Sequence, residues 1–345
     1  MVFMLFPSLP FLDDAPLSVN IRRNGAIESS HSVDVAVVDG EGRIILGYGE
    51  TERMIFPRSA MKPLQAIPLI EKLQQNELAA TLSDDLICVT CASHNGQTAH
   101  LEAAGSLLSA FDIDPSHLAC GAHWSLDQDS LIEQVRSIVQ PSRLHNNCSG
   151  KHAGMLVLAH LIGAPLSGYH RIEHPVQQHI LGCLEMMTGC ELMSYPAGID
   201  GCGAPALSGP LGNWARGFAM FAAGNKALPK ARQYACQKLA HSIANASHLI
   251  AGDRRLCSNI NEALGSAVTV KVGAEGVYAG AFHGLGLGLM LKARDGAKRA
   301  AEQALLYVIQ ALGINLPAQI ADSFCPPLTN WAGEVVGDIV IHNQD

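Results

Sequence analysis

The amino-acid sequence predicts an α+β fold: an antiparallel sheet assembled from both ends of the chain, with flanking helices and a helical lobe inserted between its halves. Strand-like alternation fills the first 50 residues, helical spacing dominates the middle, and strand patterns return after residue 265. Such strands bury their apolar faces best when they share one sheet. We expect one domain over residues 1–345 with two lobes, a sheet lobe over about 17–65 and 265–345 and a helical lobe over about 66–264.

The sheet is expected to begin with an antiparallel meander that ends near residue 50. SVNIRR and AIESS flank Asn24-Gly25, and an Asn-Gly pair is the strongest short-range signal for a β-hairpin. VDVAVVD and RIILGYG follow and are joined at Gly40-Glu41-Gly42. Glycines at such a junction favour a second reversal of the chain.

The middle of the chain has the apolar spacing of helices. The segments with this spacing are residues 63–78, 98–110, 126–139, 152–162, 174–188, 213–223 and 229–249. VTVKVG, GVYAGAF and LGLGLMLKA then form a second run of strands, followed by a predicted helix over 297–312 and a last strand over 334–342. We expect a cleft where the two lobes meet.

Composition and charge exclude several classes of protein. The 345 residues are 48% hydrophobic, so the chain can bury a large core. The net charge is −8 and the 23 Lys and Arg residues are scattered, which argues against nucleic acid as a partner. Apolar runs fall short of the roughly 20 residues of a membrane span. The apolar stretch MVFMLFPSLPFL lacks a basic start and contains two prolines, so we expect no export signal and a cytoplasmic protein. Its ten cysteines are then expected to be reduced thiols or metal ligands.

Three short motifs contain residues that could carry chemistry. Ser59-Ala60-Met61-Lys62 is a Ser-x-x-Lys motif at the start of a predicted helix, where a lysine with a lowered pKa can act as the base for a serine. Ser93-His94-Asn95 follows the apolar run LICVTCA, and its alternative role is an ordinary turn and helix cap. Lys271-Val272-Gly273 lies in a strand pattern, where the alternative is a solvated lysine.

The order of these motifs is more specific than any one of them. Ser-x-x-Lys, Ser-x-Asn and Lys-x-Gly in this order are the signature of serine β-lactamases and penicillin-binding proteins. The signature predicts acyl transfer in which Ser59 attacks a carbonyl with Lys62 as its base, Ser93 relays a proton and Lys271 forms the opposite wall. Backbone N–H groups at Ser59 and on the Lys271 strand would form an oxyanion hole, worth on the order of 10²-fold in rate.

The loop HNNCSGKHAGML has no counterpart among these three motifs. It places Cys148, Lys151 and His152 in a Gly/Asn-rich turn ahead of a helix, and the later loop AGIDGCGAPA adds Asp200 and Cys202. On chemistry alone three interpretations stay open. The loops could form a zinc site, Cys148 could be a reactive thiol, or both loops could be structural turns.

Six blocks of sequence resemble the rhizobial-type (class 3) L-asparaginase II family. They are RSAMKPLQA, CASHNGQTAH, CGAHWS, NNCSGKHAGML, GIDGCGAPA and VKVGAEGVY, and they span about residues 58–278. The resemblance implies a serine-β-lactamase-like fold, a homodimer, and hydrolysis of L-asparagine to L-aspartate and ammonia by two Ser-Lys tandems beside a zinc site.

The same resemblance implies roles for single residues. Ser59 with Lys62 and Ser93 with Lys271 would be the two catalytic tandems. Three residues would bind Zn²⁺ and help to hold the substrate: Cys148, Lys151 and Cys202. Four residues are expected at or beside the substrate: Arg58, Asp200, Asn95 and His152. The alternatives are another Ser/Lys acyl hydrolase, acting on glutamine, a β-lactam or a peptide, and a sensor that binds asparagine or zinc without catalysis.

Overall fold

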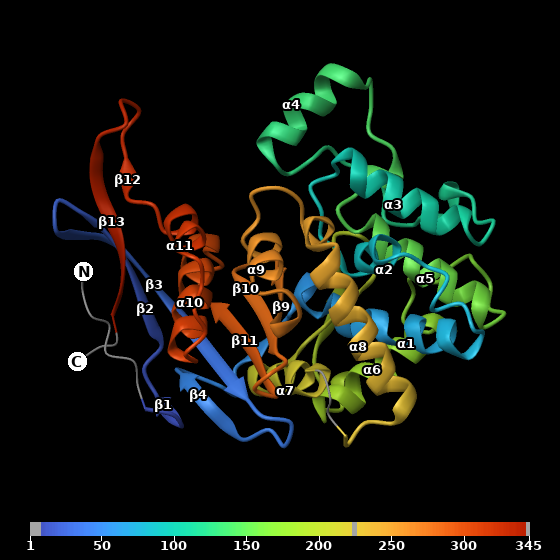
Figure 1. Cartoon of the computed structure of the whole chain (residues 1–345), viewed down its shortest axis with the longest axis horizontal. Helices are drawn as coiled ribbons and strands as arrows, with labels where there is room; N and C mark the ends of the chain where they lie inside the picture. Colours follow the sequence, from blue (N-terminus) through green and yellow to red (C-terminus); the bar gives the residue numbers. More distant parts are fainter. Residues whose placement is uncertain (1–7, 223–225, 343–345) are drawn as a thin grey trace.

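The computed structural model describes residues 8–222 and 226–342 and confirms the predicted α+β class (Figure 1). Residues 1–7 of the apolar N-terminal stretch, and residue 223 at the end of one predicted helix, lie outside the described residues. Within them, nine strands form one sheet.

The strands of this sheet come from both ends of the chain, as predicted. The N-terminal strands are β1 (Phe11–Asp13), β2 (Leu17–Arg23), β3 (Ala26–Val38) and β4 (Ile44–Tyr48). The C-terminal strands are β9 (Val268–Gly273), β10 (Val277–Phe282), β11 (Leu287–Ala293), β12 (Leu328–Thr329) and β13 (Val335–His342). The order in the sheet is β12-β13-β2-β3-β11-β10-β9, with β4 paired to β3 and β1 paired to β4. Neighbours are antiparallel except β1 and β4. The halves join twice, where Val35 of β3 lies opposite Leu291 and Ile21 of β2 lies opposite Ile339.

Strand β3 is longer than its sequence pattern indicates. AIESS and VDVAVV, separated by His31 and Ser32, form one strand of 13 residues. Its first half pairs with β2, and its second half pairs with β11 on one side and β4 on the other. The polar residues in the middle therefore stay in the strand because the ladder of hydrogen bonds continues through them.

The predicted helices are present, with ends shifted by a few residues. They are α1 (Lys62–Gln75), α3 (Thr98–Ser109), α4 (Gln128–Ser137), α5 (Ser149–Leu161), α6 (Pro175–Thr188), α7 (Leu211–Phe221), α8 (Lys230–Asn245) and α10 (Lys298–Ala311). The unpredicted helices are α2 (Asp84–Cys88), α9 (Leu256–Leu264) and α11 (Ala318–Phe324). With five, nine and seven residues, they are too short for a helical period to stand out.

Helix α1 lies at the centre of the helical part of the molecule and packs against α5, α6 and α8. Helix α7, from the middle of the chain, instead packs on β11 and β3 of the sheet. Gly288 of β11 permits this contact, because a Cβ there would lie 2.1 Å from backbone atoms of Ala215 and Ala219. The boundaries of the two lobes stay a prediction. No helix among residues 8–222 and 226–342 is long and apolar enough to cross a membrane.

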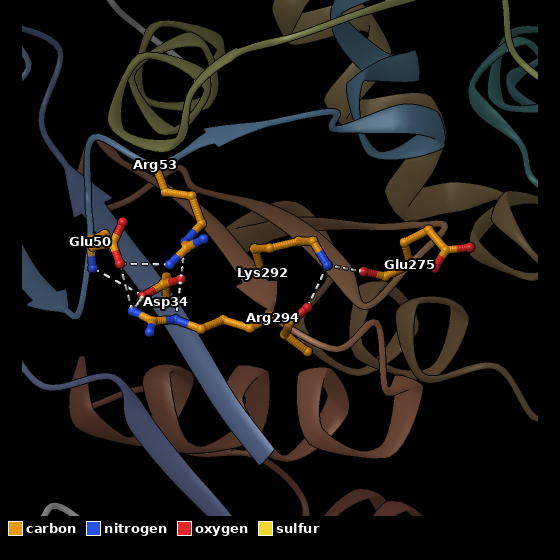
Figure 2. Close-up of polar contacts among 7 residues, drawn as sticks. Asp34, Glu50, Arg53, Glu275, Lys292 and Arg294 are labelled. Carbon is orange, nitrogen blue, oxygen red and sulfur yellow. Dashed lines mark hydrogen bonds and ion pairs between the residues drawn. The ribbon is translucent and has the colours of Figure 1, made fainter.

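A cluster of charged side chains ties the two halves of the sheet together (Figure 2). Asp34 of β3 is fully buried and forms ion pairs with Arg53 at 2.6 Å and with Arg294 at 2.7 Å. Lys292 of β11 donates a hydrogen bond of 2.7 Å to the backbone carbonyl of Glu275, in the turn between β9 and β10. The Lys292 hydrogen bond thus supports the turn that follows the Lys271-Val272-Gly273 motif.

Candidate active site

Ser59 lies in a single 3-10 turn, Arg58–Met61, which leads into α1. Arg58 has φ = 51°, in the left-handed region that few residues other than glycine adopt. Strand β9 packs directly on this turn. A Cβ on Gly273 would lie 2.5 Å from the carbonyl oxygen of Pro57 and 3.2 Å from the Cβ of Ala60. Glycine in the third motif therefore allows the strand to approach the turn that carries Ser59.

Ser59 and Ser93 line one cavity of about 310 Å³. Val272 and Gly273 of β9 form part of its wall. The other walls come from segments far apart in the sequence and include Leu126 and Asp127 before α4, Asn147 before α5 and Arg255 before α9. The fold thus brings the three motifs to one cavity, as their order predicts.

Lys62 links the first two motifs in a way that the sequence does not predict. Its side chain is only 1% exposed, and its Nζ donates hydrogen bonds to Ser93 Oγ at 2.9 Å, to the carbonyl of Ala92 at 2.5 Å and to Cys148 Sγ at 3.2 Å. The Ser-Lys hydrogen bond in the structure therefore joins Lys62 to the serine of the other predicted tandem. The physical reason is that this side chain begins at the first residue of α1 and extends to the segment before α3.

Lys271 is fully buried, so the alternative of a solvated strand lysine is wrong. Its Nζ donates a hydrogen bond of 2.9 Å to the carbonyl of Val272. Burial lowers the pKa of Lys271 to about 7. The ionisable groups that act on this amine from the surrounding elements are Cys257, Lys62, Arg255 and Cys148. Near neutral pH, part of the Lys271 population is thus uncharged and able to accept a proton.

The three predicted metal ligands lie together in the interior. Cys148, Cys202 and Lys151 are all buried, and Lys151 Nζ donates a hydrogen bond of 3.1 Å to Cys202 Sγ. The hydrogen bond with Cys202 lowers the pKa of Cys148 well below its usual value, and it raises that of Cys202. Burial lowers the pKa of Lys151, but the two sulfur atoms raise it more, so the net shift is upward. The arrangement therefore favours negative charge on Cys148 over Cys202, beside a lysine.

This set of donors fits part of a zinc site. Zinc in proteins takes four ligands, commonly thiolates and nitrogen atoms. Two sulfur atoms and one amine supply three, and the amine has to lose a proton to bind. In the part of the chain that the structure describes, no group of three or more His, Cys, Asp and Glu side chains is arranged to hold a metal ion. A zinc site here would therefore depend on Lys151 as a ligand.

Arg58 and Asp200, both predicted near the substrate, bind each other. The Arg58 guanidinium donates to the two carboxylate oxygens of Asp200, with distances of 3.0 and 3.3 Å. Burial raises the pKa of Asp200, but the hydrogen bond from Arg58 and the charge of Lys151 lower it more. Neither residue lines the cavity with Ser59 and Ser93. The ion pair instead connects the Ser59 turn to the loop that contains Cys202.

Asn95 and His152 are buried and also lie outside the cavity wall. The Asn95 side chain accepts a hydrogen bond of 2.7 Å from Arg255 Nη1, and the His152 ring shares one of 2.7 Å with the hydroxyl of Tyr169. Arg255 lines the cavity, and sequence analysis missed it because it belongs to no recognisable motif. The only local signal is the pair Arg254-Arg255 just before Cys257.

Comparison with known proteins places the chain in a family. The profile of the L-asparaginase II family matches residues 19–341. No curated protein matches the chain. Among solved structures, native Mglu is similar at 12% identity and a TM-score of 0.45, over 82% of this chain and 65% of that one. A β-lactamase from Mycobacterium bovis is similar at 14% identity and a TM-score of 0.44, over 81% of this chain and 94% of that one. D-alanine carboxypeptidase AmpC from Burkholderia cenocepacia is similar at 13% identity and a TM-score of 0.40, over 81% and 93%.

The chain spans 65% of the length of Mglu, whereas the family profile covers all but the two ends of this chain. The sequence blocks that resemble class 3 asparaginases lie inside the matched range, and their serines line one cavity. The match confirms the expected family, and this protein belongs to the L-asparaginase II family.

Proposed function

We propose that this protein is an L-asparaginase that hydrolyses L-asparagine to L-aspartate and ammonia through an ester on Ser59. The observation that carries the proposal is the convergence of Ser59 and Ser93 on one cavity, with Ser93 hydrogen-bonded to the buried Lys62. Lys271, whose pKa is lowered to about 7, supplies a second buried amine, on which the charge of Lys62 acts. Membership of the L-asparaginase II family supports a hydrolase with a small-molecule substrate.

The proposed reaction has two halves. In the first, Ser59 Oγ attacks the side-chain carbonyl carbon of asparagine, the C–N bond breaks, and the nitrogen leaves as ammonia with the proton of the serine. In the second, water attacks the ester, L-aspartate leaves, and Ser59 regains its proton. Ser93, held by Lys62, would relay these protons, with Lys62 and Lys271 as the amines that exchange them.

We propose that Cys148, Lys151 and Cys202 hold Zn²⁺. When bound, the metal would supply a fixed positive charge that helps to hold the substrate. The cytoplasmic location and the homodimer stay predictions.

Ammonia release from L-asparagine, with L-glutamine in parallel, tests the proposal. Ser59→Ala should lower kcat by roughly 10³-fold or more and retain the zinc content of the wild type. Ser109→Ala, at an exposed position at the end of α3, is the matched control and should keep wild-type activity. Full activity of Ser59→Ala would refute the assignment and direct attention to Cys148. Faster release from glutamine would favour the glutaminase alternative.

A further inference from the structure

Arg255 places a positively charged group in the wall of the Ser59 cavity without a carboxylate partner. The adjacent Arg254 forms an ion pair with Asp129 on α4, but no carboxylate of the described residues forms an ion pair with Arg255. The nearby Glu302 is engaged elsewhere, since it accepts a hydrogen bond of 3.2 Å from Tyr278 and lies 3.6 Å from Lys298. Asp127 is the carboxylate in the same cavity wall, and it accepts hydrogen bonds from the backbone N–H and the hydroxyl of Ser130 instead, so the donors of Arg255 stay available to a ligand.

The guanidinium of Arg255 is held from one side. Its Nη1 donates to Asn95 Oδ1 at 2.7 Å. Asn95 is itself fixed, because its backbone N–H donates to the carbonyl of Ala251 at 2.9 Å and its own carbonyl accepts from Ser125 Oγ at 2.6 Å. A guanidinium has five N–H donors in a planar fork. This contact therefore orients the fork and leaves other donors for an anion.

Lys298 is the other cation in the cavity wall, and it is less suited to this role. Its side chain is 64% exposed and lies beside Glu302. An exposed ammonium on a flexible stem loses more conformational entropy on binding than a guanidinium that is already oriented. Arg255 is accordingly the better oriented of the two cations in the cavity wall.

We propose that Arg255 binds the carboxylate of the substrate while Ser59 attacks its amide carbonyl, and that Asn95 is the positioning residue for Arg255. A planar guanidinium binds a carboxylate through two parallel hydrogen bonds, which gives orientation as well as affinity. The site would then select small amides that carry a free carboxylate and reject their neutral analogues. This inference rests on the proposed function, since it assigns a substrate class to the same cavity.

Two pairs of substrates test the inference. The first pair is L-asparagine and L-aspartic acid diamide, which lacks the carboxylate. The second is mono-4-nitrophenyl succinate and 4-nitrophenyl butyrate, two activated esters that a nucleophilic serine can attack. Arg255→Gln should lower kcat/KM for the carboxylate member of each pair by about 10- to 100-fold, mainly through KM, and leave the neutral member unchanged. Arg254→Gln, which removes only an exposed ion pair, is the matched control and should keep the wild-type preference.

Melting temperatures of all variants show whether each one folds. Arg255→Lys keeps the charge but not the fork, so we expect an intermediate preference for the carboxylate substrate. If Arg255→Gln does not fold, Arg255→Lys serves as the test. A preference for the carboxylate substrates as strong as that of the wild type would then show that no guanidinium is required and would overturn the inference. Equal losses on both members of a pair in Arg255→Gln would overturn the inference and leave Arg255 a purely structural role.

The ester pair separates failure of the inference from failure of the proposed function. If the wild type hydrolyses the succinate ester faster than the butyrate ester but releases no ammonia from asparagine, the proposed function is wrong and the Arg255 comparison still applies. If it releases ammonia from asparagine and shows no carboxylate preference in either pair, the inference is wrong and the proposed function stands. Turnover of neither pair overturns both.

Discussion

Replacing Gly273 by alanine tests whether the contact between β9 and the Ser59 turn positions the nucleophile. The added Cβ would lie 2.5 Å from the carbonyl oxygen of Pro57, and ordinary contact needs about 3.5 Å, so the strand and the turn have to separate by about 1 Å. A misplacement of about 1 Å can cost on the order of 10²-fold in rate. Overpacking lowers the free energy of unfolding by about 1 to 3 kcal/mol. The alanine also reduces the conformational entropy of the unfolded chain, which offsets about 0.4 to 1 kcal/mol of that loss.

The assay is kcat/KM for ammonia release from L-asparagine, measured together with the free energy of unfolding in urea. We expect Gly273→Ala to lose activity by one to two orders of magnitude and stability by about 1 to 2 kcal/mol. Gly284→Ala is the matched control, because a Cβ there meets no atom within 4 Å. It should keep wild-type activity.

Wild-type activity and stability of Gly273→Ala would refute the close contact. Lost stability with unchanged kcat/KM would show that the strand packs on the turn without positioning Ser59.

Three further predictions follow from burial and charge. The pKa of Lys271 is about 7 in the folded protein, lower than in the unfolded chain. Because the uncharged amine is the form that accepts a proton, kcat/KM should rise as pH rises through about 7. The unfolded chain binds this proton more tightly, so the free energy of unfolding should fall as pH falls from about 10 to 7. Urea titrations in which Lys271→Met keeps the same pH dependence would contradict this origin. Asp34→Ala leaves Arg53 and Arg294 with only the exposed Glu50 as a carboxylate partner and should cost about 1 to 3 kcal/mol in the same measurement, while Asp338→Ala, which removes a partly exposed ion pair, should change little. Cys148→Ser should lower zinc content, measured by elemental analysis, and raise KM for asparagine; full zinc retention would exclude Cys148 as a ligand.

Local patterns in the sequence determine much of the fold. Asn24 and Gly25 both have positive φ and join β2 to β3, as an Asn-Gly pair predicts. The late strands and α10 follow from alternation and helical spacing over 6 to 14 residues. Short elements such as α9, and the continuity of β3, could not be predicted because tertiary contacts stabilise them rather than a local period.

For the candidate site, the residues alone established the chemical types and their order along the chain: a Ser-x-x-Lys motif, a Ser-x-Asn motif, a strand lysine and two cysteine loops. Packing of distant segments then sets three features: Lys62 reaches Ser93, Lys271 is fully buried, and Arg255 enters the cavity. The physical reason is that local periodicity states which face of an element a side chain occupies, but not what covers that face. Burial, pKa and hydrogen-bond partners depend on segments that meet only when the chain has packed.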